Sequence, residues 1–509
     1  MPARARAAAL PGAIGLIVVA ALGMRLLGLD GKSLWFDEAY SVFIGDQPLS
    51  QIFRLLRAYD THPPLHYLLL HFWMPVYGYH EAAVRLPSVM ASLGVIFLTF
   101  LMGRRLRGDR LGLVAAALLA VSPFQVVASQ EARMYPFLAL FAAGASYALW
   151  LGLEEGRRHH WIAYAALIVL GLYTHHFAGL IVVAHAAYVV AFRRRAGLAA
   201  WVRWMIPVAV AYLPLAPLIL AQLTSARAWP DFRAPFGVRA LVDLFGMFSF
   251  GGGLFGMGTY FGRGTLPFVY QGPVLLPFLL LMVGGVAYLG GWRRRAFVLG
   301  YWLVPVLAVS AISLRWNMFY ERYFSFVLPP FALLVAGGVL YLVEAVPRRA
   351  RIPVCAGVVA LLASFLAPAL VDTYRAKAAY DWRGLAVYVS VKSRPDDFIL
   401  YVPAFARIPF EYYYKGDQQR DGFNPTFKIE DQTATYSTKN GREMFARIAR
   451  SHPRMWIIAT IPLGYQVRLE IAEQLKPYFR EVDGTSLGLA YAFLWESRVY
   501  HAPRGAPRP

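Results

Sequence analysis

The chain has 509 residues, of which 58% are hydrophobic and only 16% are charged. A water-soluble domain of this length carries far more charge, so the composition excludes an ordinary soluble enzyme and indicates a membrane protein. The net charge of +21 is also found in nucleic-acid-binding proteins. Here, however, the basic residues form short clusters between apolar runs, a pattern that fixes membrane topology and attracts anionic headgroups. We therefore expect membrane lipids, and no nucleic acid, as partners.

The first apolar run begins at Ala7 and continues through Leu29, directly after Arg4 and Arg6. The apolar region of a signal peptide is shorter, so we expect a retained first helix rather than a cleaved leader. The single cysteine, Cys355, lies in a later apolar run and has no second cysteine to pair with. A disulfide framework within the chain is therefore excluded.

Apolar runs of membrane-spanning length recur along the chain and predict about eleven transmembrane helices. Their approximate ranges are 8–29, 83–103, 111–128, 135–153, 161–175, 177–192, 202–221, 272–291, 296–313, 324–345 and 352–371. Basic clusters such as Arg193–Arg195 and Arg293–Arg295 separate them. Placing every basic cluster in the cytoplasm gives one consistent membrane topology, with the N-terminus inside and the C-terminus outside. We predict an all-α polytopic membrane bundle over residues 1–371, with a Gly- and aromatic-rich outer loop at 222–272.

The composition changes near Asp372, after which charges are frequent and no apolar run is long enough to span a membrane. The patterns predict helices at 380–392 and 466–479 and strands at 397–403, 454–460 and 490–495. A segment of this size can fold alone. We therefore predict a C-terminal extracytoplasmic α/β domain over residues 372–509.

Adjacent carboxylates, Asp37 and Glu38, follow the first apolar run and fall on the outer face. Ionised carboxylates at a membrane boundary are costly unless they are hydrated or functional. One of them could take a proton from an attacking hydroxyl while the other orients it or binds a metal. The alternative is the hydrated first turn of a helix, where acidic side chains complement the helix dipole.

The motif Thr61–Pro64 lies in the same outer loop and contains His62 between a threonine and two prolines. The prolines predict a rigid corner before the apolar run Leu65–Phe72, which is too short to span and is expected to lie along the interface. His62 could contact a phosphate or help to hold a metal. The alternative is an incidental histidine at a helix start.

Glu131, Arg133 and Tyr135 fall in a short outer turn at i, i+2 and i+4, so Glu131 and Tyr135 would share a face of a helix. The arginine fork matches phosphate oxygens, although an ion pair at a helix end is an equal alternative. Arg322, beside Tyr323, lies at the outer end of another predicted helix. It could bind an anionic lipid group or snorkel to the interface.

His175 and His176 also lie at an outer boundary, but no Cys or His has the spacing of a zinc site with them, so we expect no structural zinc. The helix centres are almost free of charge, unlike those of pumps and channels. P-loop, Rossmann and Ser-His-Asp signatures are not apparent. Carboxylates, arginines and tyrosines on one side of a bundle suit the chemistry of a phosphate-bearing lipid.

Several of these motifs together resemble bacterial membrane glycosyltransferases of the C-type (GT-C) fold. These are relatives of the protein O-mannosyltransferases of glycosyltransferase family 39 and of the lipid A aminoarabinose and galacturonic acid transferases. The motifs are Asp37-Glu38, Thr61–Leu65, Arg85–Ser88, Glu131–Tyr135, Arg322-Tyr323 and Asp381–Gly384. Their combined spacing is specific for the family and not for any one sugar.

The resemblance implies a polyprenyl-phosphate donor that carries one sugar, and an extracytoplasmic acceptor that is a lipid, a glycan or a protein. Asp37 matches the family's catalytic acid and would be the general base of an inverting transfer, and Glu38 matches the second acid of the pair. Arg133 and Arg322 would stabilise the leaving phosphate. The resemblance also places His62 at the site, and we group Glu131, Tyr135 and Tyr323 with it as substrate-binding residues. The expected location is a bacterial inner membrane.

One departure concerns metal binding. The aminoarabinose branch has Glu-Lys-Pro where this chain has Thr61–Pro63, and an aspartate near the position of Tyr135. Whether a divalent metal ion is a cofactor therefore stays open, and no ligand is assigned. Two other functions also stay open: a flippase or transporter of lipid-linked sugars without chemistry, and an assembly subunit whose outer domain binds a partner. A transporter is expected to show internal repeats, which are not visible here.

Overall fold

The computed structural model describes residues 3–193, 195–225, 236–251, 268–424, 436–437, 441–460 and 471–501. By its contacts the chain divides into two compact units. The helical unit contains Met1–Leu29, Gln47–Ala226 and Asp231–Ala376. The α/β unit contains the described residues of Lys377–Pro509 together with an earlier segment, Asp30–Asp46. The first outer loop thus belongs partly to the α/β unit.

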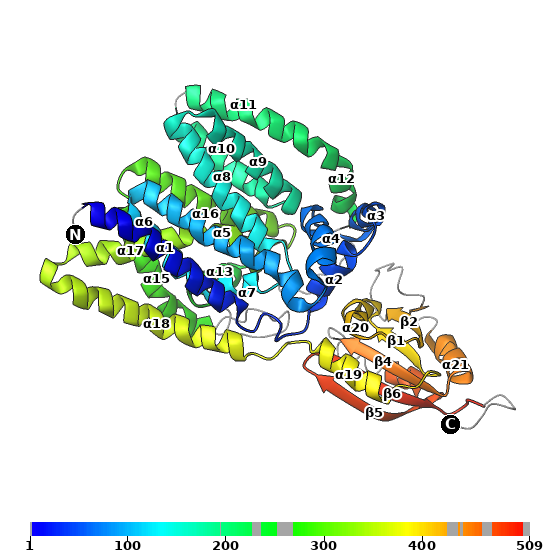
Figure 1. Cartoon of the computed structure of the whole chain (residues 1–509). Coiled ribbons are helices and arrows are strands. Elements are labelled where there is room, and N and C mark those ends of the chain that lie inside the picture. Colours follow the sequence, from blue (N-terminus) through cyan, green and yellow to red (C-terminus); the bar gives the residue numbers. More distant parts are fainter. Residues whose placement is uncertain are drawn as a thin grey trace. The chain divides into compact units, whose positions relative to one another are not determined.

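The described part of the helical unit is built of α-helices with short 3-10 turns (Figure 1). The helices are α1 (Ala3–Leu26), α3 (Leu49–Tyr59), α4 (Leu65–Tyr77), α5 (Glu81–Arg107), α6 (Asp109–Ala120), α7 (Pro123–Ser129), α8 (Tyr135–Glu155), α9 (Arg158–Thr174), α10 (Ala178–Phe192), α11 (Arg195–Tyr212), α12 (Ala216–Ser225), α13 (Val238–Phe250), α15 (Phe268–Tyr288), α16 (Trp292–Ser313), α17 (Leu328–Ala345) and α18 (Arg351–Arg375). The 3-10 turns are η1 (Leu213–Leu215), η3 (Glu321–Val327) and η4 (Arg348–Ala350).

The apolar runs are helical over most of their length, so the predicted helical membrane fold is confirmed. Three runs are divided between elements: 111–128 between α6 and α7, 202–221 between α11, η1 and α12, and 324–345 between η3 and α17. The number of spans is not confirmed. Among the described residues, six helices are long and apolar enough to cross a membrane, or seven if α6 and α7, which bend by 62° at their junction, form one span. Three further apolar helices are shorter: Leu10–Leu26, Ala178–Phe192 and Leu275–Tyr288.

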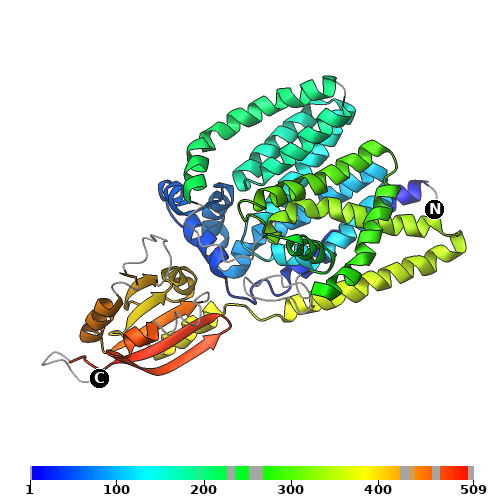
Figure 2. The same cartoon turned by 180° about the vertical axis from the view of Figure 1, so that it is seen from behind.

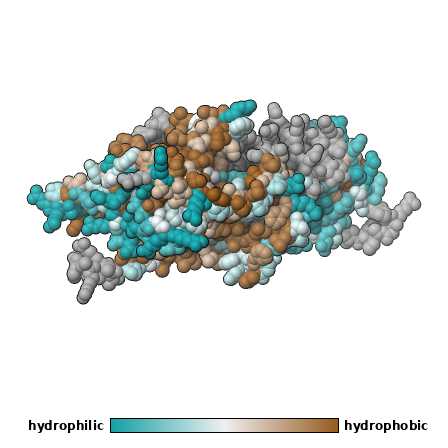
Figure 3. All heavy atoms as spheres, turned by 90° about the horizontal axis from the view of Figure 1, so that it is seen from above, coloured by the Kyte–Doolittle hydropathy of each residue, from teal (hydrophilic) through white to brown (hydrophobic). Residues whose placement is uncertain are grey.

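Two of the spans expose most of their apolar side chains. Only 17% of the apolar window is buried in Arg195–Gln222 and in Arg348–Arg375, compared with 83% in Glu321–Ala345. A space-filling view shows hydrophobic residues over much of the visible surface (Figure 3). Helices that are apolar on their exposed faces are stable in lipid and not in water, so these helices are suited to contact the membrane.

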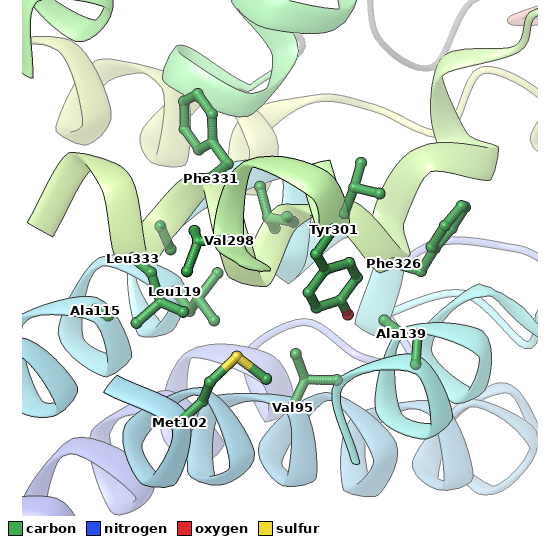
Figure 4. Packing of buried hydrophobic residues seen from close by; sticks show 14 of the residues in the cluster. Val95, Met102, Ala115, Leu119, Ala139, Val298, Tyr301, Phe326, Phe331 and Leu333 are labelled. Atoms are coloured by element: carbon green, nitrogen blue, oxygen red, sulfur yellow. The ribbon is translucent and has the colours of Figure 1, made fainter. Parts of the chain in front are cut away.

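The core of the helical unit packs around α17. Helices α15 and α17 run side by side in both views (Figures 1 and 2). Glycines allow this contact, because a Cβ added to Gly285 or to Gly338 would overlap the backbone of the facing helix. On the other side of α17, Leu333 meets Leu119 of α6 and Met102 of α5 (Figure 4). Close packing of this kind makes the bundle a rigid support for its loops.

The α/β unit contains a six-stranded mixed sheet with the order β3-β2-β1-β4-β6-β5. The strands are β1 (Phe398–Val402), β2 (Gln419–Asn424), β3 (Tyr436–Ser437), β4 (Arg454–Thr460), β5 (Phe479–Leu487) and β6 (Ala490–Ser497). Strand β1 is parallel to β2 and β4, and β6 is antiparallel to β4 and β5. The helices are α2 (Phe36–Gly45), α19 (Trp382–Lys392), α20 (Arg407–Tyr413) and α21 (Gly441–Ser451), with the 3-10 turn η5 (Ala404–Ala406).

The side chains of β1 point alternately to the two faces of the sheet, and each face is covered by helices. Phe398 and Leu400 point to the core shared with α21, whereas Ile399 and Tyr401 point to the core shared with α19 and α20. Because successive strand residues face opposite sides, a fully buried strand needs a helix layer on each face. The predicted α/β class is thereby confirmed for the C-terminal region.

The predicted strands at 397–403, 454–460 and 490–495 are confirmed as β1, β4 and β6, and the predicted helix at 380–392 is α19. Of the predicted helix at 466–479, residues 466–470 lie outside the described residues, 471–475 are helical, and Phe479 already begins β5. The predicted outer loop at 222–272 contains the helix α13, and 226–235 and 252–267 lie outside the described residues.

Candidate functional site

The two adjacent carboxylates lie in the first turn of α2, where they differ in environment. Glu38 is buried, and its Oε2 accepts a hydrogen bond from the backbone N–H of Trp35 at 3.4 Å. It therefore caps the start of the helix from a buried position, whereas the alternative interpretation of the sequence expected a hydrated first turn. Asp37 is half-buried, and its backbone carbonyl accepts a hydrogen bond from the Ser41 hydroxyl at 2.8 Å.

The chain segment before α2 is held by the C-terminal part of the same unit. The Ser33 hydroxyl donates to the carbonyl of Tyr380 at 2.6 Å and accepts from the N–H of Trp382 at 3.2 Å. The N–H of Leu34 donates to the Tyr413 hydroxyl at 2.7 Å. Contacts between residues 347 to 379 positions apart in the chain therefore set where α2 begins.

In the helical unit, a buried aspartate organises the corner that contains His62. Asp60 Oδ1 accepts from the N–H of Thr61 at 2.6 Å and from the N–H of His62 at 2.8 Å. The same oxygen lies 2.8 Å from Nδ1 of His62, and Oδ2 accepts from the Tyr67 hydroxyl at 2.6 Å. Pro63 and Pro64 follow, so backbone rigidity and the carboxylate together fix the orientation of the His62 ring.

Gln222, at the end of α12, extends this corner. Its amide donates to the carbonyl of His62 at 2.8 Å and to the carbonyl of Leu56 at 3.3 Å. Its Oε1 lies 3.0 Å from Nε2 of His176. Side chains from three separate segments of the helical unit thus meet around His62.

Aromatic rings join this corner to the turns before α8 and α17. The ring of His175 lies 5.4 Å from that of His62, 6.1 Å from that of Tyr135 and 5.3 Å from that of Tyr323, measured between centroids. We call the group of these four residues with Arg133 and Arg322 the His175 cluster. The ring contacts bring three predicted residues, His62, Tyr135 and Tyr323, together with His175. The sequence analysis had considered His175 only as a zinc ligand and had rejected that role.

Both predicted arginines lie beside the ring of Tyr135. The guanidinium carbon of Arg133 lies 5.7 Å from the centre of the Tyr135 ring, and that of Arg322 lies 6.0 Å from it. Arg133 is buried, and Arg322 is half-buried with a hydrogen bond to the Tyr320 hydroxyl. Two guanidinium groups beside one ring offer charged N–H donors of the kind that bind an anionic ligand.

The remaining predicted residue, Glu131, is half-buried in the turn between α7 and α8, where its carbonyl accepts from the N–H of Arg133 at 2.8 Å. Residues 131–134 are not helical and α8 begins at Tyr135, so the helical face proposed for Glu131 and Tyr135 does not form.

Burial and nearby charges shift the pKa values of His175 and of two groups outside the His175 cluster, Asp60 and His66. Burial raises the pKa of the Asp60 carboxyl, but the charge of His62, the hydrogen bonds from His62 and Tyr67 and the charge of Arg133 outweigh it. The net pKa of Asp60 is therefore below its ordinary value. Burial, followed by the charge of Arg133, lowers the pKa of His66 to about 3. Burial, followed by the charges of His62, His176 and Arg133, lowers the pKa of His175 well below its ordinary value. The carboxylate is ionised and these two imidazoles are neutral at pH 7.

Comparison with known proteins identifies the fold. A sequence profile described as dolichyl-phosphate-mannose-protein mannosyltransferase matches residues 61–220. ArnT from Cupriavidus metallidurans in the apo state is similar in structure, with a TM-score of 0.60 and 14% identity over 95% of this chain and 98% of that chain. The same protein bound to undecaprenyl phosphate gives a TM-score of 0.57 at 15% identity, with the same coverage. The predicted resemblance is confirmed: the chain has the GT-C fold.

A second GT-C structure supports this identification. The Archaeoglobus fulgidus oligosaccharyltransferase, crystallised with zinc and sulfate, matches with a TM-score of 0.57 and 12% identity over 94% of this chain and 72% of that chain. No curated protein sequence matches the chain significantly. At these identities the structural matches establish the GT-C fold, and residue roles must come from the chain itself.

The described residues do not fit a metal centre. No group of three or more His, Cys, Asp or Glu side chains in the described ranges is arranged to hold a metal ion. In the His62 corner, the closest candidate, Asp60 Oδ1 is already engaged by three N–H groups, and Nε2 of His176 is engaged by Gln222. The mechanism proposed below therefore assigns no step to a metal.

Three polar residues of the candidate site were missed by the sequence analysis: Asp60, Tyr67 and Gln222. Asp60 had a local signal, because an aspartate two residues before a His-Pro-Pro corner is well placed to accept backbone N–H groups. Tyr67 lies seven residues further on and Gln222 lies in a distant helix, so only the fold reveals their contacts with the corner.

Proposed function

We propose that the chain is an integral membrane glycosyltransferase that moves one monosaccharide from a polyprenyl-phosphate donor to an extracytoplasmic lipid, glycan or protein. The observation that carries the proposal is the GT-C fold over 95% of the chain. One protein of this fold, ArnT, was crystallised with undecaprenyl phosphate, and another, the archaeal oligosaccharyltransferase, with a tethered acceptor peptide. Both kinds of ligand agree with a lipid-linked donor and an outer-face acceptor.

In the proposed reaction, the carboxylate of Asp37 takes the proton of the acceptor hydroxyl. The acceptor oxygen then attacks the anomeric carbon from the side opposite the phosphate, forming the new glycosidic bond. The bond between the anomeric carbon and the phosphate oxygen breaks, and polyprenyl phosphate leaves with the electron pair. Attack from the opposite side inverts the anomeric centre. A general base of this kind contributes about 10²–10⁴-fold to the rate.

The arginines act on the leaving group in this proposal. Negative charge accumulates on the phosphate as the bond breaks, and fixed positive groups in a site of low polarity stabilise it by several kcal/mol, on the order of 3–4 for one donor. Arg133 and Arg322, both beside Tyr135, supply such groups. His62, held by Asp60, lines the site with Tyr323. Glu38 keeps Asp37 in place by capping α2.

The proposed orientation follows the distribution of basic clusters. With Arg193–Arg195, Arg293–Arg295 and the N-terminus inside, the His62 corner and the α/β unit face outward. We propose the inner membrane of a bacterium as the location, because a polyprenyl-phosphate sugar has to be presented where the acceptor is exposed.

The test uses purified protein in detergent and a panel of polyprenyl-phosphate monosaccharides with candidate acceptors, and measures released polyprenyl phosphate. Release that depends on one donor supports the proposal and names the sugar. Absence of release with every donor and acceptor, together with donor flipping in acceptor-free liposomes, contradicts it and indicates a flippase.

A further inference from the structure

The hydrogen bonds of His175 determine which of its ring nitrogens carries a hydrogen atom. The backbone N–H of Phe177 donates to Nδ1 at 3.1 Å. A ring nitrogen that accepts a hydrogen bond carries no hydrogen, so the neutral imidazole has its hydrogen on Nε2. Burial, followed by the positive groups around His175, lowers its pKa well below the ordinary value, in agreement with the Nε2–H form that the bond from Phe177 indicates.

This donor is buried without a hydrogen-bond partner among the described residues. The side chain is 4% exposed, and Nε2 is unsatisfied. Another buried histidine, His185, shows the usual arrangement, with Nε2 3.0 Å from the Ser146 hydroxyl and Nδ1 3.3 Å from the Tyr164 hydroxyl. Buried polar atoms are nearly always paired, so an unsatisfied one points to a ligand that completes it.

The surroundings indicate what kind of ligand this is. His175 contacts the rings of Tyr135 and Tyr323, and Tyr135 in turn lies beside the guanidinium groups of Arg133 and Arg322. A neutral N–H donor in a cluster that also contains two guanidinium groups favours an anion with several acceptor oxygens. Phosphate has that chemistry, whereas a neutral sugar hydroxyl gains little from the arginines.

We propose that Nε2–H of His175 donates a hydrogen bond to a phosphate oxygen of the polyprenyl-phosphate group. The inference rests on the proposed function and adds an uncharged donor to the two arginines. The ring keeps its hydrogen throughout, so it binds and orients the phosphate and transfers no proton. His175 thereby becomes a substrate-binding residue.

The test replaces His175 by three side chains and measures the affinity for polyprenyl phosphate in detergent. Phenylalanine keeps the ring contacts but removes both nitrogens, and asparagine reaches only to the position of Nδ1. Glutamine places an amide NH2 near the position of Nε2. We expect His175→Phe and His175→Asn to weaken binding about ten- to a hundredfold, and His175→Gln to stay within about threefold of wild type.

The matched control is His185→Gln, which changes an equally buried histidine away from the cluster and is expected to leave the affinity unchanged. Wild-type affinity in His175→Phe, or equal binding by the asparagine and glutamine variants, overturns the inference and leaves the proposed function standing. Failure of wild type itself to bind polyprenyl phosphate contradicts both. If only the binding of inorganic phosphate, used as a second probe, depends on His175, the ligand is free phosphate and the inference is wrong.

Discussion

Replacing Asp60 by alanine tests whether the buried carboxylate builds the His62 corner. The change removes the acceptor for the N–H of Thr61, for the N–H and Nδ1 of His62 and for the Tyr67 hydroxyl. Each buried donor left unsatisfied costs about 1–3 kcal/mol, and such costs in one network do not add fully. We therefore expect Asp60→Ala to destabilise the helical unit by about 3–5 kcal/mol.

The isosteric variant separates charge from hydrogen bonding. In Asp60→Asn the amide oxygen can still accept from the N–H groups of Thr61 and His62, and the hydroxyl of Tyr67 can turn to accept from the amide. We expect a loss of about 1–2 kcal/mol, the difference between a charged and a neutral acceptor. Asp46→Ala, an exposed aspartate at the end of α2, serves as control and is expected to change stability by less than about 0.5 kcal/mol.

The assay is thermal and urea unfolding of the purified protein in detergent, followed by tryptophan fluorescence across a series of pH values. The folded pKa of Asp60 lies below its ordinary value of 3.8, so its contribution is complete above that pH and is lost as the pH falls below it. Wild type should therefore lose more stability than Asp60→Asn on acidification below 3.8. If Asp60→Ala unfolds like wild type at pH 7, the carboxylate does not build the corner.

Two further predictions concern the α/β unit. The buried guanidinium of Arg454 donates two 2.7 Å hydrogen bonds to the carboxylate of Asp397. Asp397→Ala leaves this charge unpaired and should lower the free energy of unfolding in urea by about 3–5 kcal/mol. A loss below about 1 kcal/mol, the value of an exposed ion pair, contradicts this. Tyr413→Phe removes the acceptor for the N–H of Leu34. It should raise hydrogen exchange in residues 30–46 and lower kcat about three- to tenfold without changing the donor KM; unchanged exchange there contradicts the proposed restraint.

The helices and the central strands were predictable because their signals are local. Apolar runs of sufficient length identify membrane helices, and short runs of buried residues identified β1 and β4 within about a residue. The number of spans was less predictable, because α10 and the apolar part of α15 are short and α6 breaks before α7 at Pro123. Length alone does not say whether a short apolar helix crosses the membrane or packs within the protein.

The candidate site was only partly predictable, because the roles of its side chains depend on contacts between residues far apart in the sequence. Arg133 and Arg322 were found from their chemistry, but their common neighbour Tyr135 is a property of the fold. The state of His175 depends on a backbone N–H two residues away and on rings from other segments. The link between α2 and the C-terminal region joins residues 379 positions apart, at Leu34 and Tyr413. Periodicity and motif spacing carry no information on such pairs.

The measurement that tests the central claim most directly is single-turnover release of polyprenyl phosphate by wild type, Asp37→Asn and Asp46→Asn, each loaded with the same donor and acceptor. Asparagine keeps the shape of Asp37 but cannot take the proton from the acceptor. We predict that Asp37→Asn binds the donor normally and releases polyprenyl phosphate at least about 10²-fold more slowly, while Asp46→Asn matches wild type. Release by Asp37→Asn at the wild-type rate would show that this carboxylate is not the base and would contradict the account.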